Sequence, residues 1–197
     1  MNSEDIFHRS LADIVPVPED GKMDSFLDLG TGVAQLPLAM KERFPDADIW
    51  GIDTAAPMLR YGHMRAVELG LDINLCQRLA ENTQFESNSF DVITAYILFH
   101  EVPTEDTRKI LSEVKRILRP GGVFFPVDFK TYDQRPPSAN SRLNQWWDHV
   151  YNNEVWTEEY RDSNFSELMR EAGLIVNKNA PTLSKNFWNS LMATKEA

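Results

Sequence analysis

The sequence is poor in cysteine, in basic residues and in long apolar stretches, and each shortage argues against a class of protein. Cys76 is the only cysteine, so neither an intrachain disulfide nor a cysteine-based zinc site can form. The 20 lysines and arginines are outnumbered by 30 aspartates and glutamates, and the net charge of −10 argues against nucleic acid or an anionic membrane surface as a partner. No segment approaches the ~18 consecutive apolar residues of a membrane span. Residues 1–5 lack the basic start of a signal peptide, so a reducing cytoplasm is the expected compartment.

Apolar runs and helical periodicities alternate along the chain, as is typical of a parallel sheet with right-handed crossovers. The runs predict seven strands, at residues 25–29, 49–52, 73–77, 90–98, 123–129, 174–176 and 187–193. Helical spacing predicts helices at residues 5–14, 33–44, 58–69, 104–118 and 165–172. Ile6, Leu11 and Ile14 are expected to form the apolar side of the first helix, Thr104 to cap the fourth, and Cys76 to be buried in its strand. The sequence therefore predicts an α/β fold: a Rossmann-like, doubly wound, mostly parallel seven-stranded sheet with helices on both faces.

A turn with two glycines follows the first predicted strand, in the segment Asp28-Leu29-Gly30-Thr31-Gly32-Val33-Ala34. Glycines let the backbone approach a ligand closely, and the next helix begins there with free N–H groups. The dinucleotide fingerprint requires a third glycine at the position of Gln35, which speaks against a nicotinamide oxidoreductase. The carboxylate of Asp28 is out of place near a diphosphate, but it suits an ammonium group.

Two acidic residues follow the next two predicted strands. A carboxylate at Asp53 can accept hydrogen bonds from both hydroxyls of a ribose. The alternative is that Asp53 or Thr54 only caps the helix that is entered through Pro57. A polar side chain at Ala80-Glu81 can form hydrogen bonds with the edge of an adenine, and the alternative there is a solvated acid in a loop.

Five motifs occur in order: Asp28-Leu29-Gly30-Thr31-Gly32, Gly51-Ile52-Asp53, Ala80-Glu81, Asn88-Ser89-Phe90-Asp91-Val92-Ile93 and Leu118-Arg119-Pro120-Gly121-Gly122. With these motifs the sequence resembles the class I S-adenosylmethionine-dependent methyltransferases. It is most similar to the small-molecule branch that includes the quinone C-methyltransferases. The resemblance covers residues 23–130, and more weakly residues 160–195.

The resemblance implies a single domain over residues 1–197 that binds S-adenosylmethionine. Its parts are an N-terminal helix and linker (1–22), a cofactor-binding core (23–130), a variable insert that forms a substrate wall (131–160), and a C-terminal helix with strands (161–197). It places Asp28, Gly30, Thr31 and Gly32 around the methionine moiety, Asp53 on the ribose, Thr54 and Met58 beside the adenine, Ala80 and Glu81 at its edge, and Tyr96 along the cofactor. The family often has a third glycine at the position of Ala34, and the alanine predicts weaker affinity at most.

Methyl transfer requires mainly that a nucleophile is aligned with the activated methyl group. The candidate base, where one is needed, is His100, just after the fourth predicted strand, and the alternative is a structural or orienting histidine. Trp146, Trp147 and Tyr151 are candidates for a pocket that takes a small-molecule acceptor. Alternatively, these aromatic residues pack the insert or form a homodimer contact. No cluster with metal-ligand spacing is evident, so no metal is expected.

Three further readings stay open beside methyl transfer to a small molecule. The domain can use the same cofactor for different chemistry, or bind it without catalysis and act through interactions. The third reading is a nicotinamide oxidoreductase, against which Gln35 speaks. DNA is disfavoured as the acceptor, because Thr94-Ala95-Tyr96-Ile97 stands where amino-directed nucleic-acid methyltransferases have Asn-Pro-Pro-aromatic.

Overall fold

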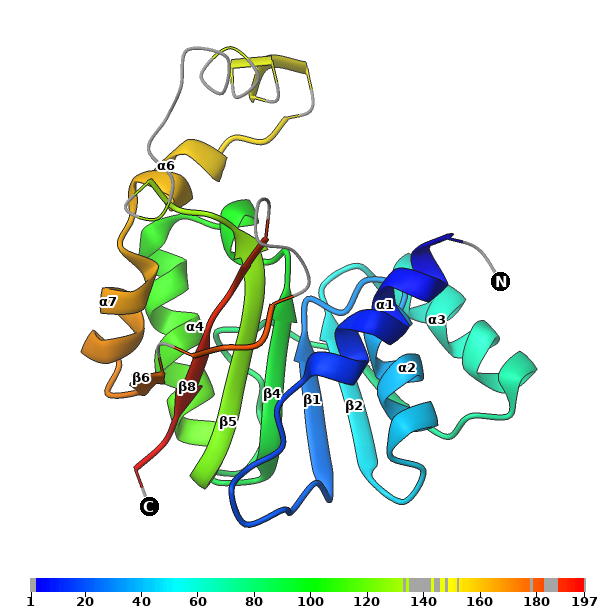
Figure 1. The fold of residues 1–197 in the computed structure, drawn as a ribbon. Coiled ribbons are helices and arrows are strands. Elements are labelled where there is room, and N and C mark those ends of the chain that lie inside the picture. The colour runs from blue at the N-terminus through cyan, green and yellow to red at the C-terminus, as the bar shows by residue number, and fades with distance from the viewer. Residues whose placement is uncertain are drawn as a thin grey trace.

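The computed structural model describes residues 3–132, 134, 143, 146–147, 149–151, 153–177, 179–182 and 188–196, which build one central sheet with helices against it (Figure 1). The helices are α1 (Ser3–Ile14), α2 (Gln35–Arg43), α3 (Ala56–Leu69), the 3-10 turn η1 (Phe99–Glu101), α4 (Thr104–Ile117), α6 (Thr157–Asp162) and α7 (Phe165–Glu171). The strands are β1 (Ser25–Leu29), β2 (Asp48–Asp53), β3 (Asn74–Gln77), β4 (Phe90–Tyr96), β5 (Leu118–Phe129), β6 (Ile175–Asn177), β7 (Trp188–Ser190) and β8 (Met192–Thr194).

The strand order is β3-β2-β1-β4-β5-β8-β6, with β7 also paired to β5. Strands β1 to β5 run parallel, whereas β7 and β8 pair antiparallel with β5, and β6 pairs antiparallel with β8. Because β7 and β8 lie along successive parts of β5, they share one position, and the sheet has seven positions. The predicted mostly parallel α/β fold is confirmed. The order reverses between β1 and β4, which makes the carboxyl ends of these strands the expected ligand edge.

Two apolar cores lie on the two faces of the sheet. Successive residues of β1 belong to different cores: Leu27 lies in the core that contains Ile110 of α4, whereas Phe26 lies in the core that contains Met40 of α2. This division follows from the two-residue period of a strand. It also explains why β1 and β4 are buried along almost their whole length, since both of their faces are covered. In Figure 1, α4 and α7 cover one face, and α1, α2 and α3 cover the other.

Two sequence-based boundaries around α4 require correction. Thr104 does not cap this helix: Pro103 holds the cap position, and the N–H of Thr104 donates to Glu159 Oε1 at 2.7 Å. The helix ends at Ile117 because Leu118 already takes an extended conformation and begins β5. The segment Pro120-Gly121-Gly122 therefore lies inside β5, not between helix and strand. A Cβ at Gly122 would come within 2.9 Å of the Asp91 carbonyl oxygen, so glycine permits the close strand pairing there.

Two expectations about burial were also wrong. Cys76 is only partly buried because β3 is the edge strand of the sheet. In α1, Ile6 is 55% exposed while Leu11 is buried. The buried side of α1 continues through Phe7, which stands four residues before Leu11 and therefore on the same face of the helix. Among the described helices, none is both long and apolar enough to cross a membrane.

Candidate functional site

A pocket of about 460 Å³ opens at the carboxyl ends of β1 and β4, where the strand order reverses. It is lined by Phe7, His8, Gly30, Thr31, Gly32, Val33, Gln35, Met58, Tyr96 and Ile97. Of the residues expected to bind a ligand, the pocket brings together Gly30, Thr31, Gly32, Met58 and Tyr96. Its volume lies in the range of about 300–1,000 Å³ that is usual for small-molecule sites.

The turn after β1 depends on three residues with left-handed backbone conformations. Gly30, Gly32 and Ala34 have φ angles of 66°, 55° and 61°. A Cβ at Gly30 would meet Leu98 Cδ1 at 2.9 Å, so a larger residue there would have to displace the Leu98 side chain. A Cβ at Gly32 would meet only Met58 Sδ at 4.0 Å, so its Cα faces the open pocket. Gly32 therefore leaves room for a ligand to approach the backbone.

Ala34 adopts this left-handed conformation at the cap position of α2. An L-residue pays about 1–2 kcal/mol there. The N–H of Ala34 donates to the Thr31 carbonyl oxygen at 2.9 Å, which closes the turn, and the side chain is fully buried. The alanine thus keeps the geometry of the turn.

Asp53 ties this turn to the start of α3. Its Oδ2 accepts the N–H of Gly32 at 2.8 Å, and its Oδ1 accepts the N–H of Ala55 at 2.8 Å. The expected alternative, a cap by Asp53 or Thr54, is wrong, because Ala55 holds the cap position of α3 and no side chain caps this helix. The bond to Gly32 adds a link that the sequence did not predict. Each carboxylate oxygen has a further lone pair, so the oriented carboxylate retains capacity for two hydroxyl donors.

Asp28 lies in β1 directly behind the turn and is 3% exposed. Its Oδ1 accepts the hydroxyl of Thr94, its register partner on β4, at 2.7 Å. Burial raises the pKa of Asp28 to about 7, and the hydrogen bond from Thr94 opposes this rise only in part. Asp28 is not among the residues that line the pocket, so its expected contact with an ammonium group stays a prediction.

The residues expected on the adenine side surround the ends of β2 and β3. Asp53 pairs in register with Gln77, whose side-chain amide donates to the Thr54 carbonyl oxygen at 2.9 Å. Ala80 and Glu81 lie in the turn that the Leu79–Asn82 bridge closes after β3. Thr54, Ala80 and Glu81 do not line the described pocket, and their binding roles stay predictions.

Phe7 and His8 of α1 are pocket residues that the sequence analysis missed. Their rings lie 5.6 Å and 5.3 Å from the ring of Tyr96, so α1 closes one side of the pocket. The available signal was the helical spacing of Phe7, Leu11 and Ile14, which places Phe7 on the buried face of α1. No sequence signal pointed to His8.

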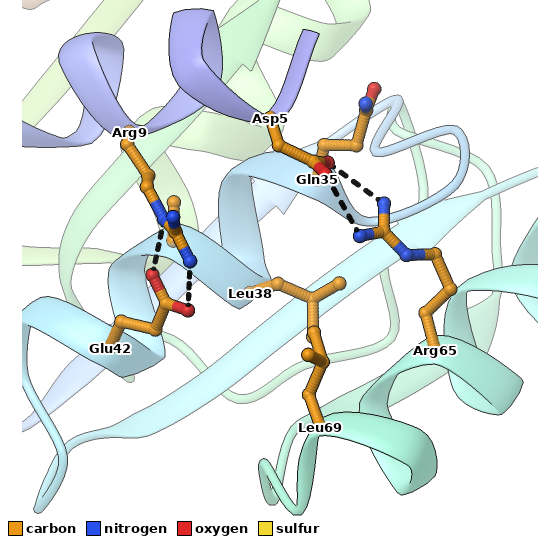
Figure 2. A pocket seen from close by; sticks show the side chains of 8 residues that line it. Asp5, Arg9, Gln35, Leu38, Glu42, Arg65 and Leu69 are labelled. Carbon is orange, nitrogen blue, oxygen red and sulfur yellow. Dashed lines mark hydrogen bonds and ion pairs between the residues drawn. The ribbon is translucent and has the colours of Figure 1, made fainter. Parts of the chain in front are cut away.

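Two ion pairs hold α1 in this place (Figure 2). Nε and Nη2 of Arg9 donate to the two carboxylate oxygens of Glu42 of α2, at 2.7 Å and 2.6 Å. Arg65 of α3 contacts both carboxylate oxygens of Asp5, at 2.9 Å and 3.2 Å. The pairs flank a hollow of about 250 Å³ between the three helices. Such partly exposed pairs contribute at most about 1 kcal/mol each, but their two-point geometry fixes the orientation of the helix.

His100 is buried in η1, away from the residues that line the pocket. Its Nδ1 lies 2.7 Å from Asp128 Oδ1, and Asp128 also accepts the N–H groups of Phe99 and Phe129. Burial alone would lower the pKa of His100, but the bonded Asp128 carboxylate, together with Glu101 and Glu154, raises it above its ordinary value. The role of His100 as a base stays a prediction.

The aromatic residues expected to form a substrate wall lie on the segment that projects beyond α6 (Figure 1). Trp146, Trp147 and Tyr151 are 55%, 55% and 62% exposed. The Tyr151 ring contacts the rings of Trp147 and Trp146, at 4.2 Å and 6.2 Å. None of the three lines the described pocket, so their contact with an acceptor stays a prediction. Tyr160, by contrast, packs against Phe165 in the core.

Comparisons with known proteins agree with this geometry. Residues 26–122 match the family model described as "Methyltransferase domain". A demethylmenaquinone methyltransferase of Thermus thermophilus is 36% identical over 103 residues, which cover 52% of this chain and 46% of the relative. The chain therefore matches about half the length of this curated relative.

Solved structures share the fold at low sequence identity. An S-adenosylmethionine-dependent methyltransferase from Aquifex aeolicus has a TM-score of 0.67 and 20% identity, with 94% of this chain and 88% of that chain covered. Phosphoethanolamine N-methyltransferase 2 of Haemonchus contortus, in complex with S-adenosyl-L-methionine, has a TM-score of 0.69 and 18% identity, with 98% of this chain and 52% of that chain covered.

Proposed function

Since residues 26–122 form a methyltransferase domain of the class I S-adenosylmethionine-dependent family, we propose that this chain binds S-adenosylmethionine and transfers its methyl group to a small-molecule acceptor. The observation that carries the proposal is the link between Asp53 and Gly32 at the strand switch point. It sets an oriented carboxylate beside a turn whose backbone is open to the pocket.

The residues present fit the chemistry of this cofactor. A ribose offers two neighbouring hydroxyl donors, and Asp53 retains two acceptor positions after its two backbone bonds. Gly30, Thr31 and Gly32 offer backbone groups to the methionine end, with Asp28 behind them. Met58 and Tyr96 offer apolar surface, and Thr54, Ala80 and Glu81 follow the neighbouring strand ends. The bound cofactor supplies a methyl group that its sulfonium has already activated.

The protein has mainly to orient the acceptor and to exclude water. Phe7 and Tyr96 form an aromatic side of the pocket next to Gly32. For an acceptor that must lose a proton, two histidines are candidate bases: His100, and His8, which lines the pocket itself. His100→Ala is expected to lower turnover far more than cofactor affinity if this residue takes the proton. The same test on His8→Ala decides between them.

The relative from Thermus thermophilus supports a planar, quinone-like acceptor, for which an aromatic pocket side is suited. We place Trp146, Trp147 and Tyr151 on the path of such an acceptor. They offer a large apolar surface on the projecting segment. A cytoplasmic location belongs to the same proposal and is supported by the single cysteine. A homodimer that brings a second aromatic segment to the pocket is also compatible with this arrangement.

The test is calorimetric titration of the purified chain with S-adenosylmethionine and S-adenosylhomocysteine, with NAD as the control ligand. We expect micromolar binding of the sulfonium compound and its product, no binding of NAD, and loss of binding in Asp53→Ala. Absence of binding by protein that is shown to be folded would refute the proposal. Binding without turnover on a panel of quinone and phenol acceptors would instead indicate a non-catalytic cofactor-binding domain.

A further inference from the structure

A second group of reactive side chains lies on the other side of the β4 end, between η1 and the segment before α6. His100 Nε2 faces one carboxylate oxygen of Glu101 and one of Glu154, and these three atoms all lie within 4.8 Å of one another. The His100 side chain is 4% exposed, whereas Glu154 and Glu101 are 28% and 55% exposed. The group is thus buried on the histidine side and reached from solvent on the glutamate side.

The distances within this group are unlike those of hydrogen bonds. Nε2 lies 3.5 Å from Glu101 Oε1 and 3.7 Å from Glu154 Oε2. A charged N–H···O bond measures about 2.7–2.9 Å. No hydrogen bond of Nε2 occurs within the described residues, although the side chain is almost fully buried. Ligands at about 2.1 Å from a tetrahedral metal ion are about 3.4 Å apart, which is close to both distances.

The other ring nitrogen of His100 is already fixed. Nδ1 lies 2.7 Å from Asp128 Oδ1, and the backbone N–H groups of Phe99 and Phe129 hold that carboxylate in place. A histidine that binds a metal usually donates its second N–H to a carboxylate in this way, which sets the tautomer and turns the free nitrogen toward the metal. Asp128 is 2% exposed and comes from β5, so the support is rigid.

The charge of the group is also unbalanced. Three carboxylates, those of Asp128, Glu101 and Glu154, surround the single imidazole of His100. Even with His100 protonated, the group keeps a formal charge of about −2, which a divalent cation would neutralise.

We propose that His100 Nε2, Glu101 and Glu154 bind a divalent first-row transition-metal cation such as Zn²⁺, with Asp128 as the carboxylate that orients the histidine. One nitrogen and two oxygens are a ligand set that such cations accept, and three protein ligands leave a position for water. None of the three ligands is among the residues that line the proposed cofactor pocket. With Nδ1 on Asp128 and Nε2 on the metal, His100 has no nitrogen left to act as a base, so metal binding leaves His8 as the candidate base.

The test uses the full chain after treatment with EDTA and removal of the chelator, without any methyl donor. Zn²⁺ is titrated by calorimetry, and Co²⁺ is added separately because its visible absorption reports tetrahedral coordination. Thermal unfolding is recorded with and without Zn²⁺, because a metal that binds the native state raises the unfolding temperature.

The variant Glu154→Gln removes a ligand at a partly exposed position, which spares the buried histidine. Glu158→Gln is the matched control, because it removes the same charge at an exposed position in α6 close to Glu154. We expect Glu154→Gln to weaken Zn²⁺ binding at least about 10-fold and to abolish the Co²⁺ spectrum, and Asp128→Asn to weaken it about 10- to 100-fold. Glu158→Gln should match the wild type. Absence of a bound metal ion in the wild type, or equal binding by both glutamate variants, would overturn the proposal whatever the cofactor titration shows.

Discussion

The two left-handed glycines at residues 32 and 70 permit a matched test of the cofactor pocket. Gly32→Ala and Gly70→Ala both force an L-residue into the left-handed region, at φ angles of 55° and 66°. Neither new Cβ meets a neighbour closer than 4.0 Å. Gly70 ends α3, whereas Gly32 lines the proposed cofactor pocket. The two variants therefore share the backbone strain and differ in what the methyl group faces.

Backbone strain of this kind costs about 1–2 kcal/mol, so both variants should lose that much free energy of unfolding in urea. Only Gly32→Ala adds a methyl group where a ligand would contact the turn. Overfilling a packed contact costs about 1–3 kcal/mol, which corresponds to an increase of about 5- to 150-fold in Kd. We expect this loss for S-adenosylmethionine with Gly32→Ala, and an unchanged Kd with Gly70→Ala.

The assay is calorimetric titration at a temperature where both variants are folded, with circular dichroism as the check. If Gly32→Ala binds S-adenosylmethionine as tightly as the wild type does, the ligand does not approach this turn, and the reasoning from the open Cα is refuted. Equal losses in both variants would mean that strain, not contact, lowers the affinity.

Two further predictions concern buried aspartates of the sheet. The pKa of Asp28 is about 7 in the folded protein and 3.8 ordinarily, so the free energy of unfolding falls as the pH rises between these values. Asp28→Asn should therefore stabilise the protein more at pH 8 than at pH 5, as measured by urea unfolding. An equal effect at both pH values would contradict the raised pKa. The Asp91 carboxylate accepts hydrogen bonds from the N–H groups of Asp24 and Ser25 and from the Arg119 guanidinium. Asp91→Ala should therefore cost about 3–5 kcal/mol of unfolding free energy. A loss under about 1 kcal/mol would show that these donors find other partners.

The sequence was sufficient for the parallel part of the sheet because its central strands β1 and β4 are buried on both faces and give clear runs in the sequence. The turn at Gly30–Gly32 and the acid at Asp53 were found for the same reason, since both follow directly from the end of a strand. The boundary between α4 and β5 was harder to predict from the sequence. Pro120-Gly121-Gly122 has the composition of a turn, but it lies inside β5, where the register with β4 shifts between Phe90 and Val92.

The contributions of distant segments could not be predicted in the same way. His8 reaches the pocket because α1 packs against α2 through apolar residues and Asp5 and Arg9 bind residues of α3 and α2. Glu154 stands far along the chain from His100 and Glu101, so no local spacing reveals that the three meet. Tertiary packing decides both cases.

The position of β8 has a consequence for the synthesis of the chain. β5 carries a long buried apolar run, and its free side is covered by β7 and β8, which are translated much later. Until residues 188–194 leave the ribosome, β5 is an open strand edge that can pair with another nascent copy. Changes that slow or prevent the docking of β8 should therefore lower the yield of soluble protein before they affect any ligand. Chaperone dependence during expression would be the first sign.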